Sequence, residues 1–122
     1  MLVTSYFSKS AKAPGAVSIA RFPPTWYSGT CYFPLAPKPD MLKIEDWDEF
    51  RCRYRKEVLD ILNPDMVLRD LDVDGAGYDI ILLCFEKERV HCHRGLVAEW
   101  FHETRGITVP EIGTDAITLL TF

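Results

Sequence analysis

The sequence lacks any long apolar segment. Its longest unbroken apolar run covers residues 80–85, far short of the roughly 18–20 apolar residues that cross a bilayer. Internal repeats and low-complexity tracts are also missing, which excludes repeat arrays and linker-like chains. Apolar residues make up 48% and charged residues 26% of the 122 residues, so global disorder is excluded as well. We therefore expect a globular chain with no membrane partner.

Acidic residues are absent from residues 1–39, whereas the rest of the chain is acidic and the net charge is −4. A protein that binds duplex DNA usually presents a broad basic face. Duplex DNA is therefore not an expected partner. The basic first third leaves room for a local anion site, so the partner we expect is a small anionic ligand.

Cysteine is scarce, with four residues, and a secretory signal pattern is missing. Residues 1–7 have no basic stretch ahead of a long apolar core. We therefore expect a cytoplasmic protein, in which the cysteines stay reduced rather than forming a disulfide framework.

A chain of 122 residues has room for a single domain, residues 1–122, with one core. Residues 22–40 are rich in proline, which excludes a long helix or a central strand. The same stretch carries several large aromatic rings, so we interpret it as an ordered loop packed on the body, with a lid as one use. Residues 111–122 form a C-terminal tail that docks on the surface or joins a second copy in a homodimer.

Apolar periodicity and turn signals predict four strands and three helices. The clearest helix is 46–62, where apolar residues recur at steps of three and four. The unbroken apolar run in 79–85 is typical of a strand buried on both faces. The other predicted strands are 2–7, 16–20 and 107–110, and the other predicted helices are 65–71 and 92–104.

This order favours a three-layer α/β fold with a mainly parallel sheet. The connection 8–15 is short for a parallel crossover, which leaves parallel and antiparallel pairing of the first two strands open. In open α/β sheets, ligands bind outside the carboxyl ends of the strands. Lys9, Arg21 and Glu86 follow three of those ends, and with parallel strands they converge on one rim.

The segment from Cys84 to Gly95 is the densest chemistry in the chain. Cys92 stands at a predicted helix start, where the helix dipole and neighbouring cations lower the pKa of a thiol. The free amides of that turn also suit a phosphate. These features predict catalytic roles for Cys92 and Glu86, and ligand-binding roles for Lys9, Arg21, His93 and Arg94.

Four interpretations of this segment stay open. It is a structural element with buried cysteines, an anion or nucleotide site, a thiol active site, or a metal site. Adjacent His91, Cys92 and His93 cannot all turn toward one ion, so no metal ligand is predicted, and no cofactor is assigned. For Glu86, an ion pair with Arg21 or Arg94 competes with a role as general acid.

Several motifs occur in an order that resembles the bacterial "domain of unknown function 488" family. They are Thr4–Phe7, Val17–Arg21, Leu35–Pro37, Leu82–Lys87 and Cys92–Trp100. The resemblance implies a small Rossmann-like α/β domain and favours parallel pairing of the first two strands. It also implies that the family's signature positions are Arg21, Cys84, Glu86, Cys92, His93 and Arg94.

Two functions from different classes follow. The first is binding, with or without processing, of a phosphate-bearing, nucleotide-like ligand at the rim of the strand ends. The second is a non-catalytic protein-interaction module that uses the loop 22–40 and the apolar tail. The sequence leaves open whether the chain is an enzyme.

Overall fold

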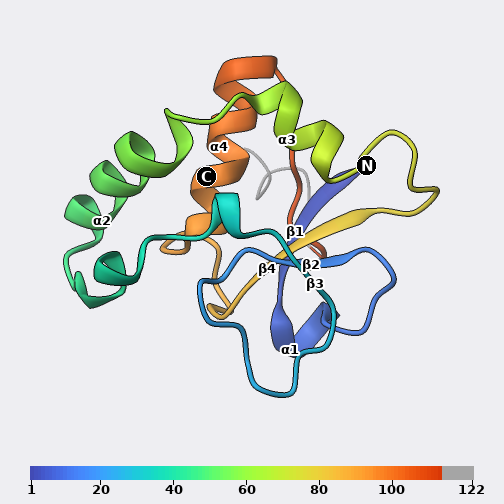
Figure 1. Cartoon of the computed structure of the whole chain (residues 1–122), viewed down its shortest axis with the longest axis horizontal. Helices are drawn as coiled ribbons and strands as arrows, with labels where there is room; N and C mark the ends of the chain where they lie inside the picture. The colour runs from blue at the N-terminus through green and yellow to red at the C-terminus, as the bar shows by residue number, and fades with distance from the viewer. Residues whose placement is uncertain (114–122) are drawn as a thin grey trace.

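The computed structural model describes residues 1–113, which form a four-stranded parallel sheet with helices around it (Figure 1). The strands are β1 (Leu2–Tyr6), β2 (Ala16–Ser18), β3 (Thr30–Cys31) and β4 (Ile80–Cys84). Their order in the sheet is β1-β4-β2-β3, and every pairing is parallel. The expected α/β class with a mainly parallel sheet is confirmed.

The strand β4 lies in the interior of the sheet, as its apolar run predicts. All five of its residues are buried, and Leu82 is paired with Thr4 of β1 on one side and Val17 of β2 on the other. The first two strands therefore do not pair with each other. Each pairs in parallel with β4, which settles the question that the short connection left open.

The expected strand 107–110 is wrong. The structure has instead a single parallel bridge between Thr4 and Glu111. The Thr4 amide donates to the Pro110 carbonyl, and the Ile112 amide donates to the Thr4 carbonyl. Pro110 has no amide to donate, so pairing beside β1 does not extend along the preceding residues.

The helices are α1 (Phe7–Ser10), α2 (Trp47–Tyr54), α3 (Pro64–Asp70) and α4 (His93–Arg105). The helix expected at 46–62 begins at Trp47, because the Asp46 carboxylate caps it by accepting from the Glu49 amide. It continues past α2 as a π-helical turn, η3 (Arg55–Leu59). Gly106, with φ +64°, ends α4.

Residues 22–40 contribute more regular structure than a loop. They contain β3 at the sheet edge and the short 3₁₀ helix η1 (Phe33–Leu35), and they lead into a second one, η2 (Pro39–Lys43). Within residues 1–113, no helix is both long and apolar enough to pass through a bilayer. The tail predicted at 111–122 lies, from residue 114 on, outside the described residues.

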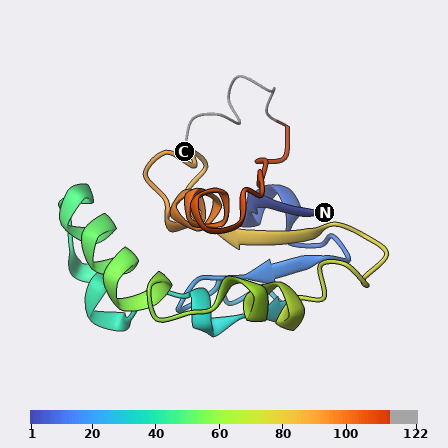
Figure 2. The same ribbon diagram turned by 90° about the horizontal axis from the view of Figure 1, so that it is seen from above.

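Two apolar clusters cover opposite faces of the sheet, because successive strand residues point to opposite sides. Leu82 and Val17 belong to the larger cluster with side chains of α2, η3, α3 and α4. Leu83 and Ala16 belong to the smaller one, with Phe7 of α1 and Tyr27. Figure 1 shows these three layers, and Figure 2 shows α4 beside β1 and β4, with α2 and α3 toward β2.

Candidate functional site

The carboxyl ends of β2 and β4 and the start of α4 enclose a cleft of about 270 Å³. Since β2 and β4 are parallel neighbours, their ends meet at one edge of the sheet, which is where α/β folds bind ligands. The side chains around the cleft come from segments far apart in the sequence, within 20–22, 37–50, 84–86 and 91–93.

This cleft brings together four of the six side chains for which the sequence predicted a catalytic or ligand-binding role, and it also contains Cys84. Arg21 follows β2, Glu86 follows β4, and Cys92 and His93 begin α4, and all four line the cleft. Lys9 and Arg94 do not line it.

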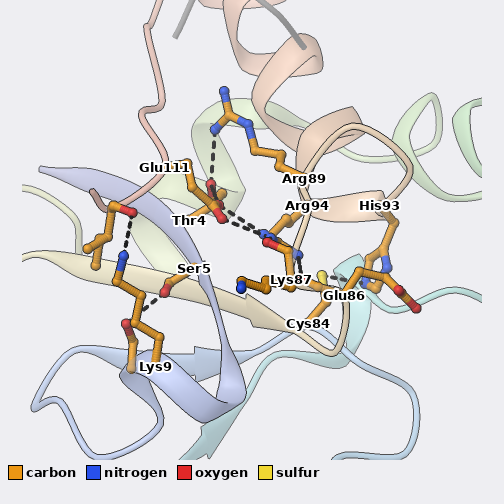
Figure 3. Close-up of polar contacts among 12 residues, drawn as sticks. Thr4, Ser5, Lys9, Cys84, Glu86, Lys87, Arg89, His93, Arg94 and Glu111 are labelled. Carbon is orange, nitrogen blue, oxygen red and sulfur yellow. Dashed lines mark hydrogen bonds and ion pairs between the residues drawn. The ribbon is translucent and has the colours of Figure 1, made fainter. Parts of the chain in front are cut away.

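Two cysteines and a histidine form the chemical centre of the cleft. The Sγ atoms of Cys84 and Cys92 and a ring nitrogen of His93 all lie within 4.8 Å of one another. Figure 3 shows the Cys84 and His93 side chains next to each other, with 3.7 Å between Sγ and Nε2. Cys84 is 1% exposed and Cys92 4%. The two thiols therefore meet in a site with little water.

The ring of His93 is fixed from two sides. Its Nε2 lies 2.8 Å from the Ile19 carbonyl oxygen, and because a carbonyl only accepts, Nε2 carries the proton. Tyr54 packs edge-on against the ring, with 5.5 Å between centroids. The buried Tyr54 hydroxyl donates to the Leu35 carbonyl at 2.6 Å. The last residue of α2 is therefore a tyrosine that orients the histidine.

The surroundings shift the pKa values of the two thiols in opposite directions. Burial alone would raise the pKa of Cys92, but the neighbouring Cys84 and His93 side chains and the charge of Arg94 lower it well below its usual value. Burial raises the pKa of Cys84, and the neighbouring Cys92 side chain raises it further. Cys92 is therefore the more acidic thiol of the pair.

Sulfur and imidazole are also ligands of zinc and other soft metals. Nε2 of His93 is directed at the Ile19 carbonyl, however, and a metal held between Cys84 and Nε2 would break that hydrogen bond. Without His93, only Cys84 and Cys92 of this cluster remain as ligands. Structural and catalytic zinc sites need at least three protein ligands. The arrangement therefore favours thiol chemistry over a metal centre.

Arg21 supplies a positive charge to the cleft. Its Nε donates to the Pro37 carbonyl at 2.9 Å and its Nη2 to the Ala36 carbonyl at 3.4 Å. The guanidinium also lies over the Phe33 ring, 5.6 Å from the centroid. These contacts hold the side chain in one orientation at the cleft wall.

Flat rings form another part of the wall. Trp47 and Phe50 are stacked with 5.6 Å between centroids and a 19° interplanar angle, and the His91 ring lies 5.1 Å from Trp47. The helical spacing assigned Trp47 and Phe50 to an apolar helix face, but it could not show that this face borders the rim.

Arg94 lies in a buried ion pair rather than in the cleft (Figure 3). It is fully buried, and its Nε and Nη2 donate to the two carboxylate oxygens of Glu111 at 2.9 and 2.8 Å. Nη1 donates to the Glu86 carbonyl at 2.6 Å and Nη2 to the Lys87 carbonyl at 3.1 Å. Arg94 therefore holds the loop that presents Glu86 to the cleft.

This ion pair extends into a network beside β1. Thr4 Oγ1 donates to Glu111 at 2.7 Å and accepts from Arg89 Nη1 at 2.9 Å. The same Arg89 nitrogen donates to the Val109 carbonyl at 2.7 Å. The network joins the loop after β4, the start of α4 and residues 109–111 to the edge of the sheet.

Lys9 lies away from the cleft. It belongs to α1, which covers the other face of the sheet through its neighbour Phe7. Its Nζ donates to the Ile112 carbonyl at 3.0 Å. The ligand-binding roles of Lys9 and Arg94 stay predictions, and their placement gives those roles no support.

Fold and site together define the class of the protein: a small Rossmann-like α/β domain with a thiol-bearing cleft at the carboxyl edge of its parallel sheet. The chain belongs to the DUF488 family, since the family model described as "Active DUF488-N3 subclade" matches residues 12–105. This match confirms the family resemblance. The matched residues include Cys84, Cys92 and His93. No curated protein and no solved structure is similar enough to count as a match.

Proposed function

We propose that the cleft binds a small phosphate-bearing, nucleotide-like molecule and that Cys92 acts on it as the nucleophile. The main support for the proposal is that one cleft contains Arg21, the stacked rings of Trp47 and Phe50, and the Cys92 thiol, whose pKa is lowered. The matched family model describes an active subclade, which agrees with a catalytic role.

Arg21 and the ring wall suit the two halves of such a ligand. Nε and Nη2 of Arg21 donate to backbone carbonyls. Its Nη1 makes no hydrogen bond to any group of residues 1–113 and is available to a ligand. A guanidinium fixed in this way donates to a phosphate at little cost in side-chain entropy. The planar half stacks on the Trp47 wall, since every base has a π-face.

The remaining cleft residues take the reactive roles. The Cys92 thiolate forms a bond to an electrophilic atom of the ligand, and the leaving group departs with the electron pair of the broken bond. Glu86, which lines the same cleft and is exposed, supplies the proton to that leaving group. His93 keeps the thiolate oriented.

A thermal-shift panel of nucleotides, nucleosides, sugar phosphates and inorganic phosphate tests ligand binding. A ligand at a hundred times its dissociation constant adds about 2.7 kcal/mol of stability. For a domain of this size we expect the unfolding midpoint to rise by roughly 8–15 °C. The shift should disappear in Arg21→Ala and persist in Lys12→Ala, an exposed cation that does not line the cleft.

A shift of equal size in Arg21→Ala would contradict the role of Arg21. No shift from any compound would instead favour the second function, a protein-interaction surface. That alternative is supported by the exposed aromatic side chains of residues 22–40, since Phe22, Trp26 and Phe33 are 64%, 58% and 46% exposed. A cytoplasmic location and a homodimer stay predictions.

A further inference from the structure

The proposed function uses Cys92 and gives Cys84 no chemical part, yet the two thiols are neighbours. Cys84 ends β4 and Cys92 precedes the first residue of α4, so two rigid elements hold them together. Both line the cleft, and their sulfur atoms lie within 4.8 Å of each other. A molecule bonded to Cys92 would therefore sit directly beside a second thiol.

The surroundings of the two sulfurs assign them different parts in a two-step reaction. The neighbouring Cys84 and His93 side chains and the charge of Arg94 lower the pKa of Cys92 against the effect of burial, whereas burial raises the pKa of Cys84. The charge of Arg94, together with the start of α4, favours negative charge on Cys84 once its proton has left.

We propose that Cys84 and Cys92 form a thiol–disulfide exchange centre that reduces a small organic disulfide entering the cleft, with Cys92 as the attacking thiol and Cys84 as the resolving thiol. The inference shares Cys92 with the proposed function but needs neither Arg21 nor an anionic ligand. A disulfide suits a buried site, because the leaving thiolate departs readily and water is not a reactant.

The reaction balances in two steps. The Cys92 thiolate attacks one sulfur of the disulfide, the S–S bond breaks, and the first thiolate leaves with the electron pair and takes a proton from solvent. Cys84 then loses its proton to solvent and attacks Sγ of Cys92, which releases the second thiolate to be protonated in turn. The protein pair is oxidised by two electrons to a Cys84–Cys92 disulfide, and the substrate is reduced to two thiols.

Bis(2-hydroxyethyl) disulfide is a suitable probe because it is small and carries no phosphate. With the reduced full chain, we expect release of two mercaptoethanol molecules per reacting pair. Peptide mass spectrometry should find a Cys84–Cys92 disulfide that dithiothreitol reverses. In Cys84→Ser the reaction should stop at a stable mixed disulfide on Cys92 with one molecule released. Exposed Cys52 is an internal control that forms only a mixed disulfide.

Three results would overturn the inference. One is a mixed disulfide on Cys52 while Cys84 and Cys92 stay unmodified. Another is a mixed disulfide on Cys92 that is as persistent in the natural sequence as in Cys84→Ser. The third is zinc retained by the purified chain that protects both thiols, which would indicate a metal centre. Disulfide exchange without any ligand-induced thermal shift would contradict only the proposed function. A thermal shift without disulfide exchange would contradict only this inference.

Discussion

Replacing Arg94 with alanine is expected to lower the free energy of unfolding by about 3–5 kcal/mol, because it removes the guanidinium that pairs with both oxygens of the buried Glu111 carboxylate. Arg94 is fully buried, and Glu111 is 8% exposed. The substitution also deprives the Glu86 and Lys87 carbonyls of their donor. Urea or thermal unfolding measures the loss.

Arg51→Ala is the matched control. Arg51 also pairs with a glutamate, Glu99, at 3.0 Å, but its side chain is 52% exposed. Exposed pairs contribute less than about 1 kcal/mol, so this variant should unfold close to the natural sequence. Equal losses in the two variants would contradict the structural role assigned to Arg94. A folded, stable Arg94→Ala chain that no longer binds ligand would restore its predicted direct contact.

Replacing Gly15 with alanine is expected to cost about 3 kcal/mol or more of the free energy of unfolding, a severe case of overpacking. A Cβ at this position would lie 1.7 Å from the Asp79 carbonyl oxygen and 2.8 Å from its carbonyl carbon. These are backbone atoms and cannot rotate away. Gly15 also accepts a hydrogen bond from the Ile81 amide at 2.8 Å. Relief of the clash would therefore separate the amino end of β2 from β4.

Gly77→Ala is the control for this effect. Gly77 has open space around its Cβ position, and its strain comes only from a φ of +75°. The left-handed conformation costs a side-chain-bearing residue roughly 1–2 kcal/mol. In denaturant unfolding, the free energy of unfolding of Gly15→Ala should therefore be lower than that of Gly77→Ala. The opposite rank would show that the close approach of Gly15 to Asp79 is easily relieved.

Much of the fold could be predicted because its signals are local. The apolar run of β4, the spacing in α2 and the Asp46 cap each act within a few residues. The convergence of Arg21, Glu86 and Cys92 followed from one general property, the meeting of parallel strand ends. These predictions needed no knowledge of which side chains touch.

The rest depended on contacts between distant residues. Nothing in the sequence marks Glu111 as the partner of Arg94, because it stands where we expected the start of a tail. Lys9 follows a strand end as Arg21 does, but α1 carries it to the other face of the sheet. The contact of Tyr54 with His93 arises from the packing of the end of α2 against the start of α4, which periodicity cannot specify.

The pH dependence of alkylation at Cys92 tests the central claim most directly, namely that the cleft holds a thiolate. Only the thiolate reacts, so the rate rises with pH and levels off above the thiol pKa. Normalising each site to its own plateau removes the effect of burial. Because the pKa of Cys92 is lowered, its midpoint should fall well below the ~8.5 of an ordinary cysteine. His93→Ala should move the midpoint upward. A midpoint at or above that of an unfolded-peptide thiol would contradict the account.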